Sequence, residues 1–294
     1  MKTEEINIRD PYILEYQGKY YLYGTRSSTA WGLADGFDCY VSEDLKNWSE
    51  PIEIFHKYQG FWADRNYWAP ECHYYEGEFY LFASFKAEGR HLGIQILKSS
   101  DPTGPFTTHS DGPVTPLDWE CLDGTLYLDL DGIPHLIFSH SFSQHPNGAM
   151  CELELTSDLS AASGSPKLLF EATDAAWAIP FPYGEIEFGI KGDMYFSDGP
   201  FLHRLNSGRL ALLWSSWSKN GYAMGIAYSD NDEINGKWLH EETPIYGKDG
   251  GHGMIFNTPE EKLMLTLHYP NEKTQEKPIF IELEEKNDCL VMKK

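Results

Sequence analysis

The chain consists of short hydrophobic runs separated by polar turns. Aromatic and β-branched residues gather in runs of a few positions, and Gly, Asp and Asn interrupt these runs along the whole length. Apolar residues spaced three or four apart, which would indicate amphipathic helices, are almost absent. The pattern therefore predicts an all-β protein.

The same order of elements recurs five times along the chain. Each copy contains a corner, a strand, a polar turn and a second apolar strand. In the first four copies a further strand follows, ending in Ser and then Asp and a turn, as in YVSEDLKNWSE. The copies are DPYILEYQGKYYLYGT from Asp10, APECHYYEGEFYLFAS from Ala69, DGTLYLDLDGIPHLIFS from Asp123, DGPFLHRLNSGRLALLWS from Asp198 and HGMIFNTPEEKLMLTLH from His252.

Units of two hairpins at a spacing of about 50 residues are typical of β-propeller blades. Five such units fill the chain, which predicts one domain, residues 1–294, folded as a single five-bladed β-propeller. A β-sandwich with Greek-key connections is the alternative, but it does not explain the repeat. Residues 171–197 exceed a normal connection, and we expect them to form a loop over one mouth of the propeller.

The first residue of each copy is expected near the propeller axis, because the innermost strands run alongside that axis. Taken singly, Asp-Pro and Asp-Gly corners are ordinary turn residues. Taken together, the five corners place three carboxylates and an imidazole around one opening, and such crowding is costly unless the groups have a chemical role or a cation. These corner positions are Asp10, Ala69, Asp123, Asp198 and His252.

Crowded carboxylates also suggest a kind of chemistry. Groups that repel one another acquire different pKa values, so that one stays ionised as a base while another stays protonated as an acid. This division suits glycoside hydrolysis, in which one group activates water and the other protonates the leaving oxygen. The repeat therefore favours a catalytic site over five independent turns.

The net charge of the chain argues against some classes of binding partner. A formal net charge of −22 argues against nucleic acids and anionic membranes, which repel a polyanion. No apolar run approaches the ~18 residues of a membrane span. The N-terminal MKTEEINIRDPYIL lacks the apolar stretch of a secretory signal, and the five cysteines show no CxxC or zinc spacing. We therefore expect a cytoplasmic protein with reduced thiols, whose oligomeric state the sequence does not predict.

Several motifs resemble glycoside hydrolase family 43, and the resemblance covers nearly the whole chain. That family consists of five-bladed β-propellers acting mainly on arabinofuranosides and xylosides, so the resemblance implies an oligosaccharide or glycoside substrate. The order and spacing of the motifs together carry the resemblance. They are Arg9-Asp10-Pro11, Ser42-Glu43-Asp44-Leu45-Lys46-Asn47-Trp48, Trp68-Ala69-Pro70-Glu71, Asp198-Gly199-Pro200 and Gly250-Gly251-His252-Gly253.

The resemblance also implies roles for individual residues. Asp10 matches the general base, which deprotonates water for attack at the anomeric carbon with inversion. Asp123 matches the aspartate that adjusts the pKa of the acid and orients the sugar. His252 matches the histidine that often holds a calcium ion, so the predicted cofactor is Ca²⁺ at the propeller centre, coordinated mostly by water. A polar residue lining a wet channel is the alternative for His252.

Asp198 stands where the family usually has a glutamate as general acid. Asp is one methylene shorter, and a misplacement of about 1 Å can lower a rate ~100-fold. Either the inner strand is shifted inward so that Asp198 still serves, or the acid is Asp174, Glu185 or Glu187 in the preceding connection. Some branches of the family have His-Glu-Trp in the third blade, where this chain has His140-Ser141-Phe142 and so lacks that glutamate.

Aromatic rings and hydrogen bonds hold neutral sugars. Trp68, beside the axial position of the second copy, is the first stacking candidate, and Trp31 and Trp177 lie in connections that could reach the rim. Glu71, two residues into its strand, and His140 are further candidates for substrate contact.

These observations lead to one main hypothesis, an inverting, exo-acting glycosidase that releases a terminal α-L-arabinofuranoside. A β-D-galactofuranoside and a β-xyloside are the other candidate substrates. The alternative from another class is a carbohydrate-binding propeller with little or no turnover. The shortened acid and Ser141 motivate that alternative, whereas Asp10 and Asp123 speak against it. A propeller that serves as a protein-interaction platform is a third hypothesis.

Overall fold

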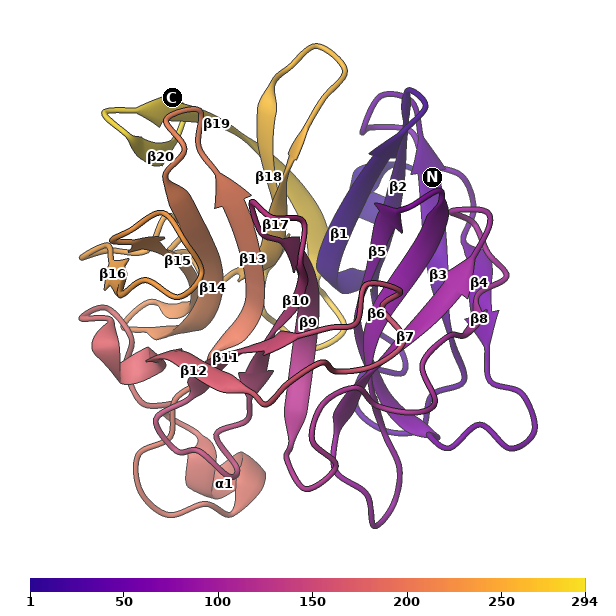
Figure 1. Cartoon of the computed structure of the whole chain (residues 1–294), viewed down its shortest axis with the longest axis horizontal. Coiled ribbons are helices and arrows are strands. Elements are labelled where there is room, and N and C mark those ends of the chain that lie inside the picture. The colour runs from indigo at the N-terminus through magenta and orange to yellow at the C-terminus, as the bar shows by residue number, and fades with distance from the viewer. Residues whose placement is uncertain (294) are drawn as a thin grey trace.

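Within residues 1–293, which the computed structural model describes, twenty strands form five separate four-stranded sheets. In every sheet the strands are antiparallel and hydrogen-bonded in sequence order, from the innermost first strand to the outermost fourth. The chain passes through the sheets one after another around a common centre (Figure 1). The predicted all-β, five-bladed β-propeller is confirmed.

The first three blades precede the long connection. Blade one contains β1 (Ile8–Tyr16), β2 (Lys19–Arg26), β3 (Gly36–Ser42) and β4 (Ile52–His56). Blade two contains β5 (Arg65–Tyr75), β6 (Glu78–Lys86), β7 (Gly93–Ser99) and β8 (Thr107–Thr108). Blade three contains β9 (Cys121–Leu128), β10 (Pro134–His140), β11 (Ala149–Glu154) and β12 (Lys167–Glu171).

The last two blades follow the long connection. Blade four contains β13 (Asp198–Arg204), β14 (Leu210–Ser218), β15 (Gly221–Ser229) and β16 (Trp238–His240). Blade five contains β17 (Gly251–Asn257), β18 (Leu263–Tyr269), β19 (Lys277–Lys286) and β20 (Cys289–Met292). The helices are η1 (Thr3–Glu5), η2 (Ala172–Asp174) and α1 (Gly184–Phe188), and no helix within residues 1–293 has the length and apolar character of a membrane span.

The hydrophobic core lies between neighbouring blades. Between blades one and two, the rings of Phe37 and Phe85 lie 5.7 Å apart, and between blades three and four those of Phe170 and Trp214 lie 5.2 Å apart. Central strands are therefore covered on both faces. This explains why they appear in the sequence as continuous apolar runs rather than as an alternation of apolar and polar residues.

The ring closes where blade five meets blade one, with β17 and β18 beside β1 (Figure 1). Each blade is built from its own consecutive strands, so no strand is exchanged at the closure. Polar contacts join the two blades instead. Arg9 Nη1 lies 3.0 Å from Oε1 of the fully buried Glu276, and the Asn7 amide donates to the carbonyls of Thr274 and Glu276.

Every inner strand has an irregularity in its pairing close to its first residues. One residue at this point adopts a left-handed backbone conformation, which costs ~1 kcal/mol or more for a residue with a Cβ. Its recurrence in all five blades marks a bulge built into the fold. The left-handed residues are Asp10 (φ 56°), Ala69 (φ 44°), Asp123 (φ 58°), Gly199 (φ 55°) and His252 (φ 46°).

In blade four the recurring position is Gly199, so the predicted alignment of Asp198 with Asp10 is wrong by one residue. Asp198 pairs with Ser215 and lies just before the bulge. The reason is steric, because a Cβ at Gly199 would lie only 2.6 Å from Cδ2 of His252. Glycine leaves room for the imidazole, and the carboxylate is carried by the preceding residue.

Hydrogen bonds from one blade to the next hold these corners. In four blades the left-handed residue donates its N–H to a side chain of the neighbouring blade. That side chain lies near the end of the second strand of its own blade. The N–H of Gly199 donates instead to Oδ2 of Asp123 (3.2 Å). The four donor–acceptor pairs are Ala69 with Thr25 (2.8 Å), Asp123 with Ser84 (2.9 Å), His252 with Ser215 (2.8 Å) and Asp10 with Nδ1 of His268 (3.2 Å).

The long connection between β12 and β13 lies on the end of the propeller where the inner strands begin, and α1 projects from it at the lower edge of Figure 1. The N–H of Ile179 donates to the carbonyl of Trp217 (2.9 Å), and that of Tyr195 to the carbonyl of Pro146 (2.8 Å). These bonds attach the connection to blades four and three, so that it borders the mouth of the propeller.

Candidate active site

Asp10, Asp123 and His252 meet at the axial end of the inner strands. Nδ1 of His252 lies 3.2 Å from Oδ1 of Asp10 and 3.6 Å from Oδ2 of Asp123. All three residues are buried, with at most 7% of their surface exposed. Burial opposes a charge on His252, but the negative charges of Asp10 and Asp123 outweigh it and raise the pKa of the imidazole. The imidazole therefore lies between two carboxyl groups and keeps its proton to a higher pH than a free histidine does.

Asp10 is held in the ionised state. The Thr25 hydroxyl donates to Oδ2 of Asp10 (2.6 Å), and Nε of Arg9 lies 3.5 Å from Oδ1. Burial alone would raise the pKa of Asp10. The charges of His252 and Arg9, together with the Thr25 hydrogen bond, outweigh burial and lower this pKa to about 2. A carboxylate in this state can accept a proton from water at any working pH.

Asp123 and Asp198 keep their protons to a higher pH than Asp10 does. Burial raises the pKa of Asp123 to about 7 and that of Asp198 to about 6, and the charge of His252 offsets only part of this effect. The phenol of Tyr222 donates to Oδ2 of Asp198 (3.0 Å). The centre thus combines one carboxyl group of low pKa with two of raised pKa, which is the division that an acid and a base require.

His268 supports Asp10 from blade five and is completely buried. Its Nδ1 accepts the N–H of Asp10, so the proton is assigned to Nε2, which donates to Oδ1 of Asn271 (3.1 Å). Burial, reinforced by the charge of Arg9, lowers the pKa of His268 to about 3 and keeps the ring neutral. The ring also stacks on Tyr222, with centroids 5.6 Å apart, and so links the surroundings of Asp10 and Asp198.

The side chains at the centre do not form a protein cage for a metal ion. Among residues 1–293, no group of three or more His, Cys, Asp and Glu side chains is arranged to hold one. Nδ1 of His252 lies 3.2 Å from Oδ1 of Asp10, so this ring nitrogen is already engaged within the protein. The Ca²⁺ ion, with water as its main ligand, stays a prediction, and the chemistry derived from these side chains does not involve it.

One known protein family matches nearly the whole chain. The model of the family described as glycosyl hydrolases family 43 matches residues 5–283. The chain belongs to this family. As the resemblance predicted, this is a family of glycosyl hydrolases.

Individual members of family 43 resemble this chain to different extents. A crystal structure of an endo-arabinase from Bacteroides thetaiotaomicron VPI-5482 is 33% identical, with a TM-score of 0.89 and 98% of each chain covered. An extracellular endo-α-(1→5)-L-arabinanase of Bacillus subtilis (strain 168) is 27% identical over 46% of this chain and 44% of its own length. An extracellular exo-α-(1→5)-L-arabinofuranosidase of Cellvibrio japonicus (strain Ueda107) is 26% identical over 35% of this chain. The chain therefore matches less than half the length of these two curated relatives.

Several residues of this family-43 site were not singled out from the sequence. They are Thr25, Tyr222, His268 and Glu276, together with Arg9, which was quoted only as part of a motif. A signal existed for two of them, because each of the five repeated segments ends on a hydroxyl residue or, in blade five, on His268. No sequence signal marks Tyr222, which reaches Asp198 across its own blade, or Glu276, which meets Arg9 only where blade five closes on blade one.

Trp31 and Trp68 form an aromatic corner beside Asp10. Their rings lie 5.6 Å apart in an edge-on arrangement, and the Arg9 guanidinium lies 5.2 Å from the Trp31 ring centroid. Trp31 is 48% exposed, whereas Trp68 is half-buried and donates its indole N–H to the carbonyl of Ala30. Since Arg9 also approaches Asp10, this exposed ring lies next to the Asp10 carboxylate and remains a candidate for sugar stacking.

Among the other predicted contact residues, Glu71 lies close enough to the centre for its charge to raise the pKa of His252. Trp177 is a buried core residue whose ring packs 4.8 Å from that of Trp214, which corrects the prediction that it reaches the substrate. Its neighbour Gly225 leaves the space that this indole fills. Glu71 is buried, with Oε2 3.2 Å from Nε2 of His73. His140 lies at the end of β10, where its ring stacks on Trp119 with centroids 4.1 Å apart.

The alternative acids lie on the surface of the long connection. Asp174 is exposed in η2 and accepts the N–H of Glu171 (3.0 Å), and Glu185 and Glu187 are exposed on α1. Asp198, in contrast, is only partly exposed, and its pKa responds to the charges of the central groups. Among these four carboxyl groups, Asp198 is the one that the geometry connects to the centre.

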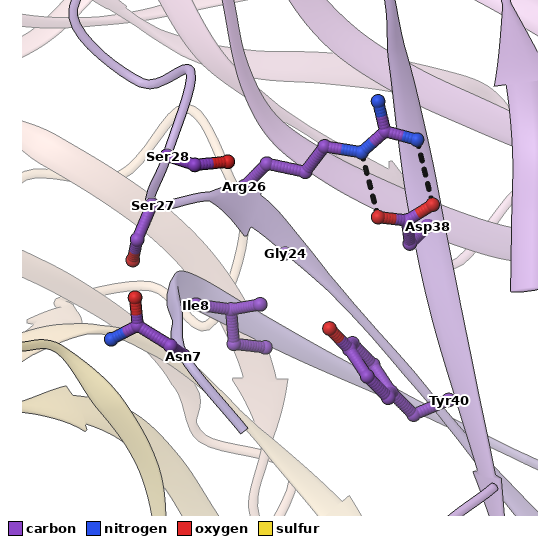
Figure 2. A pocket seen from close by; sticks show the side chains of 8 residues that line it. All are labelled: Asn7, Ile8, Gly24, Arg26, Ser27, Ser28, Asp38 and Tyr40. Atoms are coloured by element: carbon purple, nitrogen blue, oxygen red, sulfur yellow. Dashed lines mark hydrogen bonds and ion pairs between the residues drawn. The ribbon is translucent and has the colours of Figure 1, made fainter. Parts of the chain in front are cut away.

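A small polar pocket of about 230 Å³ lies on blade one (Figure 2). Asn7, Ser27 and Tyr40 line it, and Arg26 is paired with Asp38 through two hydrogen bonds of 2.6 Å. Neither the predicted carboxylates nor the central imidazole is among its lining residues within the described chain. This pocket therefore contains none of the groups predicted to be catalytic.

Proposed function

We propose that the enzyme hydrolyses α-L-arabinofuranosidic bonds with inversion, with Asp10 as general base and Asp198 as general acid. The observation that carries the assignment is the contrast within one centre between ionised Asp10 and the raised pKa of Asp198. The choice of sugar is supported by the relatives, which are named as an endo-arabinase, an endo-arabinanase and an exo-arabinofuranosidase.

In the proposed reaction a water molecule attacks the anomeric carbon from the side of Asp10. Its oxygen forms the new C–O bond while Oδ of Asp10 takes the proton, and the bond to the leaving oxygen breaks as Asp198 donates its own proton to that oxygen. Thr25 and Arg9 keep the Asp10 carboxylate in place. Asp123 and His252 complete the centre and orient the sugar beside it.

The shorter Asp198 side chain fits this role through its place in blade four. It lies one residue before the bulge, so its backbone does not occupy the position of Asp10 in blade one. The Tyr222 hydroxyl holds one carboxyl oxygen, which leaves the other for the leaving group. We propose that this anchoring, rather than side-chain length, positions the proton.

The proposal has two versions, which differ in whether the enzyme cleaves a sugar chain at its end or within it. The sequence predicted release of terminal residues, while two of the relatives are named as endo-acting. Product analysis on linear α-(1→5)-arabinan distinguishes them: free arabinose from the first minutes supports exo action, and a ladder of oligosaccharides supports endo action.

The first experiment uses aryl glycosides of α-L-arabinofuranose, β-D-galactofuranose and β-D-xylopyranose together with linear arabinan. We expect turnover of arabinofuranosyl substrates by the native enzyme and its loss in Asp10→Asn. Proton NMR of the first product should show the inverted anomer. Saturable sugar binding without turnover of any of these substrates would instead support the carbohydrate-binding propeller, and turnover of another glycoside would move the substrate assignment to that sugar.

The place where the enzyme acts stays a prediction. The two curated relatives are named as extracellular, whereas the sequence led us to expect a cytoplasmic protein. Fractionation of the producing cells from their medium, followed by immunodetection, tests the point. Protein in the medium of intact cells would overturn the cytoplasmic prediction.

A further inference from the structure

A second pocket, of about 360 Å³, lies on the end of the propeller where the inner strands begin. Trp62 precedes β5, Arg90 and His91 lie between β6 and β7, and Leu117 and Trp119 precede β9. We call this the tryptophan pocket. We propose that it binds a sugar residue of a neutral saccharide chain that extends from the catalytic centre, an inference that rests on the proposed function because the ligand is the substrate chain itself.

Two indole rings provide the apolar walls of the tryptophan pocket, and both are held by the protein. The N–H of Trp62 donates to Oε1 of the buried Gln95 (2.6 Å). The Trp119 ring lies nearly parallel to that of His140, with an interplanar angle of 10°. Rings that are fixed before binding lose little conformational entropy when a sugar stacks on them. This contact also gives His140 a place in substrate binding, as support for Trp119.

Hydrogen-bond donors lie beside these rings. The exposed Arg90 guanidinium lies 5.8 Å from the Trp62 ring centroid, and His91 is exposed at the edge of the pocket. An aromatic platform with a few polar groups is the usual composition of a site for a sugar, whose ring has apolar C–H faces and a polar rim of hydroxyls.

The charges around the pocket favour a neutral ligand. The nearby carboxylate of Glu120 accepts hydrogen bonds from the Lys86 ammonium and the N–H of Leu92, and it lies 3.1 Å from Nδ1 of His91. It is therefore satisfied within the protein. The chain as a whole carries a net charge of −22, which repels an acidic polysaccharide at long range. A neutral pentose chain needs no charged partner in the pocket, and the net charge of the protein does not repel it.

The tryptophan pocket is within reach of a chain bound at the centre. Trp119 is four residues before Asp123 in the sequence, and an extended backbone of that length spans at most about 14 Å. Of the intervening residues, Cys121 and Leu122 belong to the start of β9, which is extended. A short oligosaccharide can therefore contact both places, and longer substrates should bind more tightly than short ones.

Binding measured in the absence of turnover tests this inference. In an Asp10→Asn background, the affinity for linear arabinan would be compared by affinity electrophoresis and calorimetry between the parent and the additional variants Trp62→Ala, Trp119→Ala and Arg90→Ala. We expect each tryptophan variant to bind arabinan about ten-fold more weakly, the scale of losing one well-packed aromatic contact. Tyr74→Ala, which removes an exposed aromatic ring at the C-terminal end of β5, is the matched control and should bind as the parent does.

The outcomes separate this inference from the proposed function. Unchanged arabinan affinity in the folded Trp62→Ala and Arg90→Ala variants would overturn the pocket, even if the native enzyme hydrolyses arabinofuranosides. Lost affinity together with an inactive native enzyme would support the pocket and overturn the hydrolytic assignment. Tighter binding of polygalacturonate than of arabinan, abolished by Arg90→Ala, would overturn the neutral ligand. Arg90 is exposed, so its variant remains informative if a tryptophan variant does not fold.

Discussion

Gly199 lies directly against the imidazole of His252, in a gap where a Cβ would be only 2.6 Å from the ring carbon Cδ2. Blade four thus has no side chain at the corner that carries Asp10 in blade one and Asp123 in blade three. This omission lets the His252 ring reach both carboxyl groups, and it leaves the N–H of Gly199 free to donate to Asp123.

Substitution of Gly199 by Ala should therefore displace the central imidazole. We expect kcat/KM to fall about 100-fold or more, because His252 must move by an ångström or so and Asp10 loses its partner. The left-handed backbone, with φ at 55°, adds about 1 kcal/mol of strain. Gly77→Ala is the matched control, since Gly77 also has a positive φ but open space around it. Similar activity losses in the two variants would show that backbone strain, and not the contact with His252, is responsible.

The raised pKa of Asp198 predicts an alkaline limit to activity. The acid must carry its proton, so kcat/KM on a natural arabinoside should fall as the pH rises through about 6. Asp10 has a pKa of about 2 and stays ionised, so activity should persist well below pH 4 for as long as the protein remains folded. A pH profile of initial rates checks this. A profile that rises between pH 5 and 7 would mean that another group limits the reaction.

The same carboxyl groups affect the free energy of unfolding in opposite directions. Asp10 acts at acidic pH, and Asp123 and Asp198 act towards neutral pH. The lowered pKa of Asp10 contributes stability above the ordinary carboxyl range near pH 4, and this is lost as the pH falls towards 2. The raised pKa values of Asp123 and Asp198 make stability decline as the pH rises from about 4 to 7. The lowered pKa of His268 offsets part of this decline, because its contribution to stability grows as the pH rises from about 3 to 6.5. Thermal melting between pH 3 and 8 should therefore give the highest Tm near pH 4 to 6. A Tm that climbs steadily to pH 8 would contradict this balance.

Removal of the Tyr222 hydroxyl should move the alkaline limit of activity. Its hydrogen bond to Oδ2 stabilises the charged form of Asp198, so Tyr222→Phe raises the pKa of that carboxyl. The fall in kcat/KM should then occur at a higher pH than in the native enzyme, with a lower maximum because the carboxyl group is less well positioned. Tyr23→Phe removes a hydroxyl that donates to the carbonyl of Pro102 in the core, and it should leave the limit in place. An unmoved limit in Tyr222→Phe would remove Asp198 from the role of acid.

A substrate whose leaving group needs no proton should distinguish the roles proposed for Asp10 and Asp198. Asp198→Asn should lower kcat on arabinan by about 100-fold or more but affect a nitrophenyl arabinofuranoside much less, because that leaving group departs without protonation. Asp10→Asn should abolish both reactions, since water must be deprotonated in either case. The ratio of the two rates in each variant is the measurement. An equal loss on both substrates in Asp198→Asn would assign that residue to structure rather than to proton transfer.

The repeated pattern of corner, strand, turn and strand determined the five blades, because each blade closes its hydrogen bonds locally and its residues are close in sequence. The same pattern led to Asp10, Asp123 and His252, since in a propeller the starts of the inner strands converge at the axis. The sequence did not determine the position of the bulge in blade four, so Asp198 was aligned one residue away from its place. A local pattern cannot show that the ring of His252 occupies the space of a missing Cβ at Gly199.

Only the tertiary structure decided which groups surround each carboxyl and hence their pKa values. Tyr222 reaches Asp198 within blade four, but His268 and Arg9 meet around Asp10 only because the ring closes between its last and first blades. Likewise, Trp177 looked exposed in a long connection but packs into the core beside Trp214. Contacts of this kind join residues far apart in the chain, and their electrostatic effects depend on distances of a few ångströms. The amino-acid sequence alone therefore determined the fold and the kind of chemistry, while packing between blades decided the protonation states that make the chemistry work.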